Sequence, residues 1–292
     1  MVKTLSRTDK IFNYVNISLL FFLAFVTAYP LIYVASMSVS DVFAIAKREI
    51  WLWPKGFSLD AYQLVLQKPD VWLSYYNTVW YVVVGTTINL FMTLLVSYPL
   101  SRRSFSLSGR LMLYMAFTMW FHGGLIPNFI LVNKLGMYNT RWAIVVPDAI
   151  ATWNVIITRT FFRHTIPDEI IESVKIDGGN DYQILWKIVI PLSSAILAVN
   201  ILFYAVHHWN SFFDALIYLR DKKLHPLQLF LRSILIEQSG SMQDDASDIE
   251  ADLLKEKLKY AIIIFAMAPI LCAYPYLQKY FVKGVMMGSL KG

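Results

Sequence analysis

The stretch from Asn77 to Pro99, NTVWYVVVGTTINLFMTLLVSYP, decides the fold, because it contains no Asp, Glu, Lys or Arg. A helix needs about 20 predominantly apolar residues to cross the hydrocarbon core of a membrane. Backbone N–H and C=O groups in lipid must be hydrogen-bonded within the spanning structure, and a single segment achieves this only as a helix. Residues 77–99 therefore predict a membrane-spanning helix.

Comparable segments lie on both sides of this stretch, at roughly 14–36, 111–132, 142–162, 188–207 and 260–281. Together they predict an all-α integral membrane protein with six transmembrane helices. The six-helix domain would cover 14–282, between an N-terminal tail, 1–13, and a C-terminal tail, 283–292. Prolines within several segments predict kinks or helix ends. His122, next to Gly123 and Gly124, also predicts an interrupted helix rather than a proton relay.

The composition agrees with this class. The chain is 57% hydrophobic and 16% charged, whereas a soluble domain is about 25% charged. The single cysteine, Cys272, excludes a disulfide framework and a Cys/His metal site. In a membrane protein, the net charge of +6 is more typical of basic cytoplasmic loops than of nucleic-acid binding. The uncharged run Ile11–Ser40 exceeds a signal-peptide core, so we expect a retained first span.

The distribution of Lys and Arg bears on orientation. The raw count is balanced between the two sides, and short loops decide orientation more strongly than long ones. The compact clusters Arg102–Arg103, Arg159/Arg163 and Lys279/Lys283 favour cytoplasmic termini. This orientation makes the loop at about 163–187 cytoplasmic and the long loop at about 208–259 extracellular.

The polar interval from Thr165 to Asn180 predicts two short helices joined by a glycine turn. Pro167 suits a first helical turn, and the acids that follow it suit the helix dipole. Gly178–Gly179 would end the first helix, and a second would start at Asp181. Two short helices joined in this way could dock into a groove of a partner protein. They could also form an ordinary amphipathic connector on the membrane surface.

Glu172-Ser173-Val174-Lys175-Ile176-Asp177-Gly178-Gly179, followed by Ile190–Pro191, resembles the cytoplasmic "EAA" loop of ABC importer permeases. The resemblance departs from the family pattern at three positions. Ser173 and Val174 stand where the family has alanines, and Gly179 stands where Ala or Ser is usual. Further stretches resemble the carbohydrate (maltose-type) group, and especially its Gram-positive lipoprotein-dependent oligosaccharide branch: 121–127, 135–140, 209–212, 226–228 and 278–292.

The resemblance implies the type I ABC importer permease fold and a role in oligosaccharide import across the bacterial plasma membrane. It implies a second homologous permease subunit, two ATPase subunits and an extracellular lipid-anchored sugar-binding protein as partners. This chain has no Gly-rich phosphate loop, so we expect it to be non-catalytic, to bind no cofactor, and to rely on ATP and Mg on the partner ATPase. The ATPase-coupling residues implied are Glu172, Ser173, Val174, Asp177, Gly178 and Gly179.

A sugar pathway needs aromatic faces and hydrogen-bonding groups. The candidates are Trp120, Asn128, Trp153, Asn154, Asn200, Tyr204, Trp209, Asn210 and Asp214. The aromatic residues could instead pack in the interior or anchor the chain at the membrane interface. The Asn side-chain amides could instead form hydrogen bonds between helices. Asp148 is a further candidate, because an acid within a predicted span is a functional hypothesis by default.

Two other classes are weighed against the importer. An ion-gradient-driven transporter or channel would predict paired intramembrane charges, and only Asp148 qualifies. A membrane-embedded enzyme would predict a catalytic motif such as His-Glu-x-x-His or Gly-x-Ser-x-Gly, and the sequence has neither.

Overall fold

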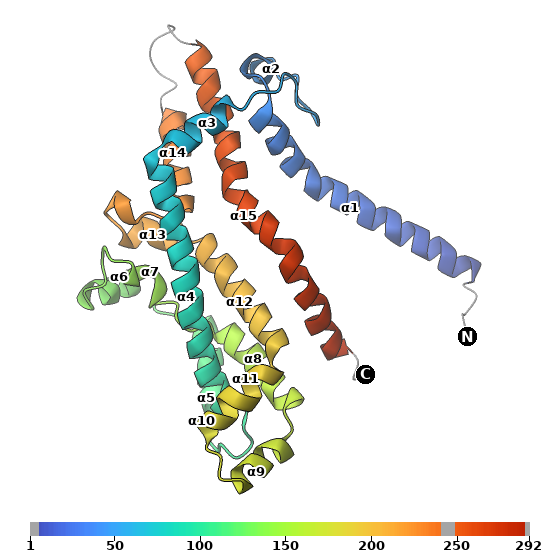
Figure 1. Ribbon diagram of the computed structural model, residues 1–292, viewed down its shortest axis with the longest axis vertical. Coiled ribbons are helices and arrows are strands. Elements are labelled where there is room, and N and C mark those ends of the chain that lie inside the picture. The colour runs from blue at the N-terminus through green and yellow to red at the C-terminus, as the bar shows by residue number, and fades with distance from the viewer. Residues whose placement is uncertain (1–5, 241–248, 290–292) are drawn as a thin grey trace. The chain divides into compact units, whose positions relative to one another are not determined.

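The computed structural model describes residues 6–240 and 249–289, and within them it consists of helices and turns without a strand (Figure 1). The chain divides into two compact units. The first comprises Met1–Pro69 with Leu231–Ala268, and the second comprises Asp70–Phe230 with Pro269–Gly292. The all-helical class expected from the sequence is confirmed.

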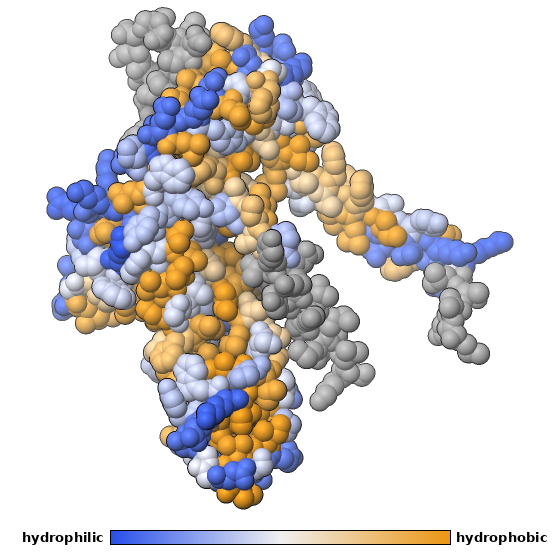
Figure 2. All heavy atoms as spheres, in the orientation of Figure 1, coloured by the Kyte–Doolittle hydropathy of each residue, from blue (hydrophilic) through white to orange (hydrophobic). Residues whose placement is uncertain are grey.

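The first unit contains α1 (Arg7–Val39), α2 (Val42–Ala46), α3 (Asp60–Gln67) and the parts of α14 (Leu227–Gly240) and α15 (Ile249–Ser289) that fall within its bounds. Ser6 caps α1 in a capping box with Asp9. Met37, Ile45 and Ile50 form its small core. Large apolar side chains on α1 are mostly exposed, and Figure 2 colours much of this helix as hydrophobic. Such a surface is typical of a helix that faces lipid.

The second unit is built on α4 (Pro69–Ser101). After it come α5 (Ser108–Trp120), α6 (Leu125–Lys134), α7 (Trp142–Val145) and α8 (Thr152–Thr165). The chain continues with α9 (Asp168–Ile176), α10 (Asp181–Ile184), a π-helical turn (Leu185–Val189), α11 (Ile190–Leu192) and α12 (Ser194–Trp209). It reaches α14 through α13 (Phe213–Tyr218) and a 3-10 turn (Lys222–Leu224).

Two predicted spans, 14–36 and 77–99, are single helices, α1 and α4, each long and apolar enough to cross a membrane. The expectation of one helix through 111–132 is wrong, because α5 and α6 meet at a 112° bend. Gly124 adopts a left-handed φ of 86° in the break, which glycine tolerates without strain. The interruption predicted at His122–Gly124 is therefore confirmed.

The expectation of one helix through 142–162 is also wrong, because α7 and α8 are separate helices and Pro147 lies between them. The segment 188–207 bends by 84° where Ser193 separates α11 from α12. Among the described residues, two helices could span a membrane, or four if each of two bent pairs counts as one span. The predicted segment 260–281 lies inside α15, and the total of six spans stays a prediction.

The predicted tails are partly helical. Helix α1 begins at Arg7, within the predicted N-terminal tail, and α15 continues to Ser289, within the predicted C-terminal tail. Residues 1–5 and 290–292 lie outside the described residues, as do the acidic positions Asp244, Asp245 and Asp248 of the predicted extracellular loop.

Helix α4 carries a buried stripe of small and polar residues at helical spacing: Ser74, Asn77, Thr78, Gly85, Thr86, Asn89, Thr93 and Ser97. Residues three or four apart lie on one face of a helix. Close packing of small residues and hydrogen bonds between helices stabilise membrane bundles, where lipid is as apolar as the side chains. This stripe is therefore the packing face of α4.

A substitution at Gly85 tests whether this stripe is the packing face of α4. A Cβ atom at this position would collide with the imidazole of His208 on α12, and that ring is held by Asn89. We expect Gly85→Ala to destabilise the protein by about 1–3 kcal/mol, as overpacking does. The measurement is thermal unfolding in detergent. Gly109→Ala on α5 is the control, because nothing lies within 4 Å of its added Cβ; a Gly85→Ala melting temperature equal to that of the control would contradict the packing.

Candidate functional site

The interval 165–180 has the conformation that its sequence predicts. Helix α9 follows Pro167 and has Asp168 and Glu169 in its first turn. Gly178 has a φ of 81°. Asn180 then caps α10 in a capping box with Gln183. We call residues 163–187 the coupling loop, and its predicted helix–turn–helix is confirmed.

One face of α9 attaches the coupling loop to the helical bundle. Ile171 is buried in an apolar cluster with Leu94 and Tyr98 of α4 and with Ile184 of α10, and Val174 packs against the same cluster. Burying an aliphatic side chain of this size contributes about 1.5–3 kcal/mol. This packing holds α9 against α4.

The other face of α9 is directed to the outside. Glu172, Ser173 and Asp177 are exposed, and Ile176 at the tip is 86% exposed. The carboxylate of Glu172 makes no hydrogen bond or ion pair with any residue that the structure describes. A free acid beside a large exposed aliphatic side chain forms a surface suited to a partner with a basic and apolar groove.

Val174 and Gly179, two of the residues that differ from the family pattern, contact each other. A Cβ atom on Gly179 would lie 2.5 Å from Cγ1 of Val174 and 2.9 Å from its carbonyl oxygen. The Gly179 amide donates to that carbonyl at 2.8 Å. The larger side chain at 174 and the missing side chain at 179 therefore compensate for each other in volume.

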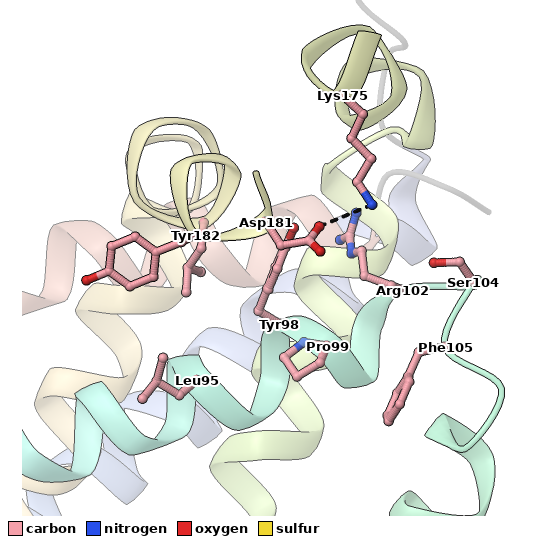
Figure 3. A pocket seen from close by; sticks show the side chains of 10 residues that line it. Leu95, Tyr98, Pro99, Arg102, Ser104, Phe105, Lys175, Asp181 and Tyr182 are labelled. Atoms are coloured by element: carbon pink, nitrogen blue, oxygen red, sulfur yellow. Dashed lines mark ion pairs between the residues drawn. The ribbon is translucent and has the colours of Figure 1, made fainter. Parts of the chain in front are cut away.

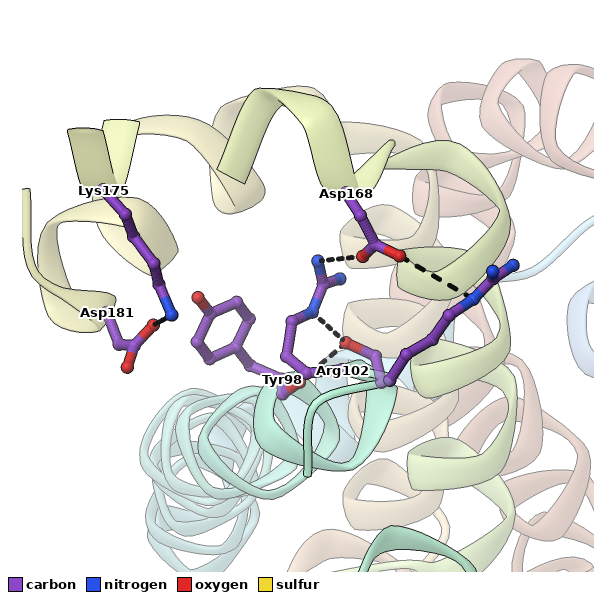
Figure 4. A network of polar contacts seen from close by, with 7 residues as sticks. Tyr98, Arg102, Asp168, Lys175 and Asp181 are labelled. Carbon is purple, nitrogen blue, oxygen red and sulfur yellow. Dashed lines mark hydrogen bonds and ion pairs between the residues drawn. The ribbon is translucent and has the colours of Figure 1, made fainter. Parts of the chain in front are cut away.

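Charged residues surround the attachment to α4 (Figure 4). The Asp168 carboxylate lies 3.8 Å from Nη1 of Arg102 and 3.7 Å from Nε of Arg103. Lys175 and Asp181 form a 3.2 Å ion pair across the glycine turn. Figure 3 shows Arg102, Lys175, Asp181 and Tyr98 around a pocket of about 430 Å³ between the end of α4 and α10.

A second cluster lies where α4, α8 and α12 meet. The Tyr204 hydroxyl is 2.6 Å from Oγ1 of Thr93 and accepts from the Ala151 amide at 3.4 Å. Asn154, Tyr204, Asp148 and His207 line a pocket of about 270 Å³. Asp148 lies 3.6 Å from Nε2 of His207. This combination of a hydroxyl, an amide and ionisable groups is suited to bind a polyhydroxylated ligand.

The other predicted pathway residues are dispersed. Asn200 is buried and donates to Thr158 at 2.6 Å, which is the interhelical role left open from the sequence. Trp209 is buried edge-on to Tyr75, and the exposed Asn210 bonds the Val206 carbonyl. Trp120, Asn128, Trp153 and Asp214 do not line the 270 Å³ pocket.

Sequence reasoning missed His207, Thr93 and Asn89. Asn89 donates to the Asp148 carbonyl and contacts Nε2 of His208. The spacing of small and polar residues within 77–99 was a usable signal, because a span facing only lipid has no need of an amide. The pairing of His207 with Asp148 depends on the break between α7 and α8, and hydropathy does not locate such a break.

The fold and the two clusters describe a helical protein with apolar helices long enough to span a membrane, an exposed helix–turn–helix loop and a polar pocket, features that fit the class of a transport permease. The polygalacturonan/rhamnogalacturonan transport system permease protein YtcP of Bacillus subtilis is 38% identical over 97% of this chain and 99% of its own. Protein LplC of the same organism is 37% identical over 98% and 97%. The chain belongs to this family of ABC transport permeases.

A solved structure and a family search complete the comparison. A chain from the crystal structure of a bacterial ABC transporter involved in the import of the acidic polysaccharide alginate superposes with a TM-score of 0.86 at 34% identity, covering 96% of this chain and 100% of the other. No family model matches the sequence. The relatives support the importer and give no support to the ion-gradient alternative.

The contact between Val174 and Gly179 generates a prediction. We expect Gly179→Ala to destabilise the coupling loop by about 1–3 kcal/mol through overpacking. Val174→Ala in the same chain should recover part of that loss, because it removes the Cγ1 contact and leaves the carbonyl contact. Thermal unfolding of the two single variants and the double variant measures the coupling between them. Strictly additive effects would show that the two positions act independently.

Proposed function

We propose that this chain is a multi-pass permease subunit of an ATP-driven importer of oligosaccharides or polysaccharide fragments in the bacterial plasma membrane. The observation that carries the proposal is the coupling loop, with its exposed Glu172 and Ile176 on a helix held against α4. Relatives that import polygalacturonan or rhamnogalacturonan and alginate support a saccharide as the transported molecule.

The proposal includes the partners. A second homologous permease completes the pathway, two ATPase subunits hold ATP and Mg, and an extracellular lipid-anchored binding protein delivers the sugar. The coupling loop docks in a groove of an ATPase subunit, with Glu172 meeting a basic or backbone donor and Gly178 permitting the turn. Both termini are then cytoplasmic, the region 208–259 is extracellular, and six spans lie within 14–282.

The docking role gives the first test. We expect the tagged chain to co-purify an ATPase and a second permease. Glu172→Ala should lower sugar-stimulated ATP hydrolysis of the reconstituted importer at least tenfold, since a charged contact made on docking contributes about 1.5–3 kcal/mol and about 1.4 kcal/mol is a factor of ten. Asp70→Asn, an exposed acid in the first turn of α4, is the matched control. Unchanged hydrolysis with Glu172→Ala would refute the docking assignment.

The pathway role gives a separate test. Tyr204→Phe removes the hydroxyl that joins Thr93 to the pocket wall, so uptake of labelled oligosaccharide by the reconstituted importer should fall several-fold while the ATPase still co-purifies. Tyr114→Phe on α5 is the control, because it removes a hydroxyl from an exposed residue that does not line the pocket. Equal uptake by Tyr204→Phe and the unmodified importer would remove the pocket from the pathway.

A further inference from the structure

Arg102 is in an unusual position for a charged residue. Its side chain is only 10% exposed, at the point where α4 has just ended. Burial lowers the pKa of its guanidinium, while the neighbouring Tyr98, Asp168 and Asp181 act to raise it. Burying a charge costs several kcal/mol of desolvation free energy, so a buried ion pair often adds little to the stability of the fold. Its presence beside the coupling loop therefore requires another reason.

The Arg102 guanidinium has fewer hydrogen-bond partners than it has N–H donors. Its Nε donates to Oγ of Ser101 at 3.0 Å, and the group lies 5.3 Å from the centre of the Tyr98 ring. Neither Nη1 nor Nη2 has a hydrogen-bond partner among the described residues. The nearest carboxylate is Asp168 on α9, whose Oδ1 is 3.8 Å from Nη1. That distance is an ion pair but is too long for a hydrogen bond.

A small shift of α9 would complete this contact. An approach of about 1 Å brings an arginine and a carboxylate at this separation to the distance of charge-assisted hydrogen bonds, which are about twice as strong as neutral ones. The pocket of about 430 Å³ beside Arg102 gives the side chains room to rearrange. A closed pair would give the buried guanidinium a hydrogen-bond partner that it lacks in the observed conformation.

We propose that Asp168 and Arg102 are positioning residues for transport, and that their ion pair closes when α9 is pressed against the end of α4 during the ATP cycle. The proposal rests on the proposed function, because it assigns the movement of α9 to a docked ATPase. It deepens that function by naming the contact through which α9 acts on α4. Arg103 pairs with the same carboxylate from the solvent side, with its side chain 74% exposed, and its pair is screened by water and salt.

The test uses the whole importer in proteoliposomes, with sugar-loaded binding protein. Asp168→Asn should lower stimulated ATP hydrolysis and sugar uptake at least fivefold and should still co-purify the ATPase. Asp168→Glu restores the charge and should recover most of the stimulation. Arg103→Gln is the matched control and should change stimulation less than twofold, because its pair with Asp168 is exposed.

A double variant keeps the proposal testable if one substitution disturbs assembly. In Arg102→Gln with Asp168→Asn, no buried charge is left unpaired, so the loss of stimulation should be clearly smaller than the product of the two single losses. Multiplicative losses would overturn the proposal, as would an unchanged Asp168→Asn importer or equal losses for Asp168→Asn and Arg103→Gln. Failure of the unmodified chain to recruit an ATPase would instead refute the proposed function itself.

Discussion

The side-chain amide of Asn89 connects α4 both to the break between α7 and α8 and to helix α12. Its Nδ2 donates to the carbonyl of Asp148, and its Oδ1 lies 2.6 Å from Nε2 of His208 on α12. A polar group in a protein interior costs free energy unless it is hydrogen-bonded. Because water is scarce inside a membrane bundle, the partners of Asn89 determine where the break before α8 and where α12 can lie against α4.

The break between α7 and α8 follows from the same constraint. Non-helical backbone at membrane depth is tolerated where it is buried in protein or lines a cavity. Here the Asp148 carbonyl accepts from Asn89, and the Ala151 amide donates to the Tyr204 hydroxyl. Side chains of α4 and α12 thus bond backbone groups that the break releases. The same break places Asp148 beside His207, so the polar pocket exists because the helix is interrupted there.

The coupling loop could be predicted from sequence because its signals are local. Proline and acids at a helix start, a glycine in the left-handed region and an Asn–Gln capping box act over a few residues. Hydropathy measures apolar content and not backbone continuity, so it indicated one helix in each of 111–132 and 142–162. The break in the first segment was indicated by Gly123 and Gly124, whereas Pro147 in the second predicted only a kink or a helix end and not the full separation of α7 from α8. The neighbours of Asp148, Asn89 and His207, could not be predicted either, because they belong to α4 and α12, which lie far from Asp148 in the sequence.

The two sites of the second unit share one continuous element. At the coupling loop, Leu94 and Tyr98 of α4 pack against Ile171 of α9. At the pocket, Thr93 contacts Tyr204 and Asn89 contacts His208. These positions lie within about three turns of one helix, or roughly 14 Å at a rise of 1.5 Å per residue. Helix α4 continues without a break through Pro99, which lacks an N–H donor, whereas α5–α6 and α7–α8 are interrupted. If the Arg102–Asp168 pair closes as proposed, the contact is made at the end of the same helix that holds the pocket residues.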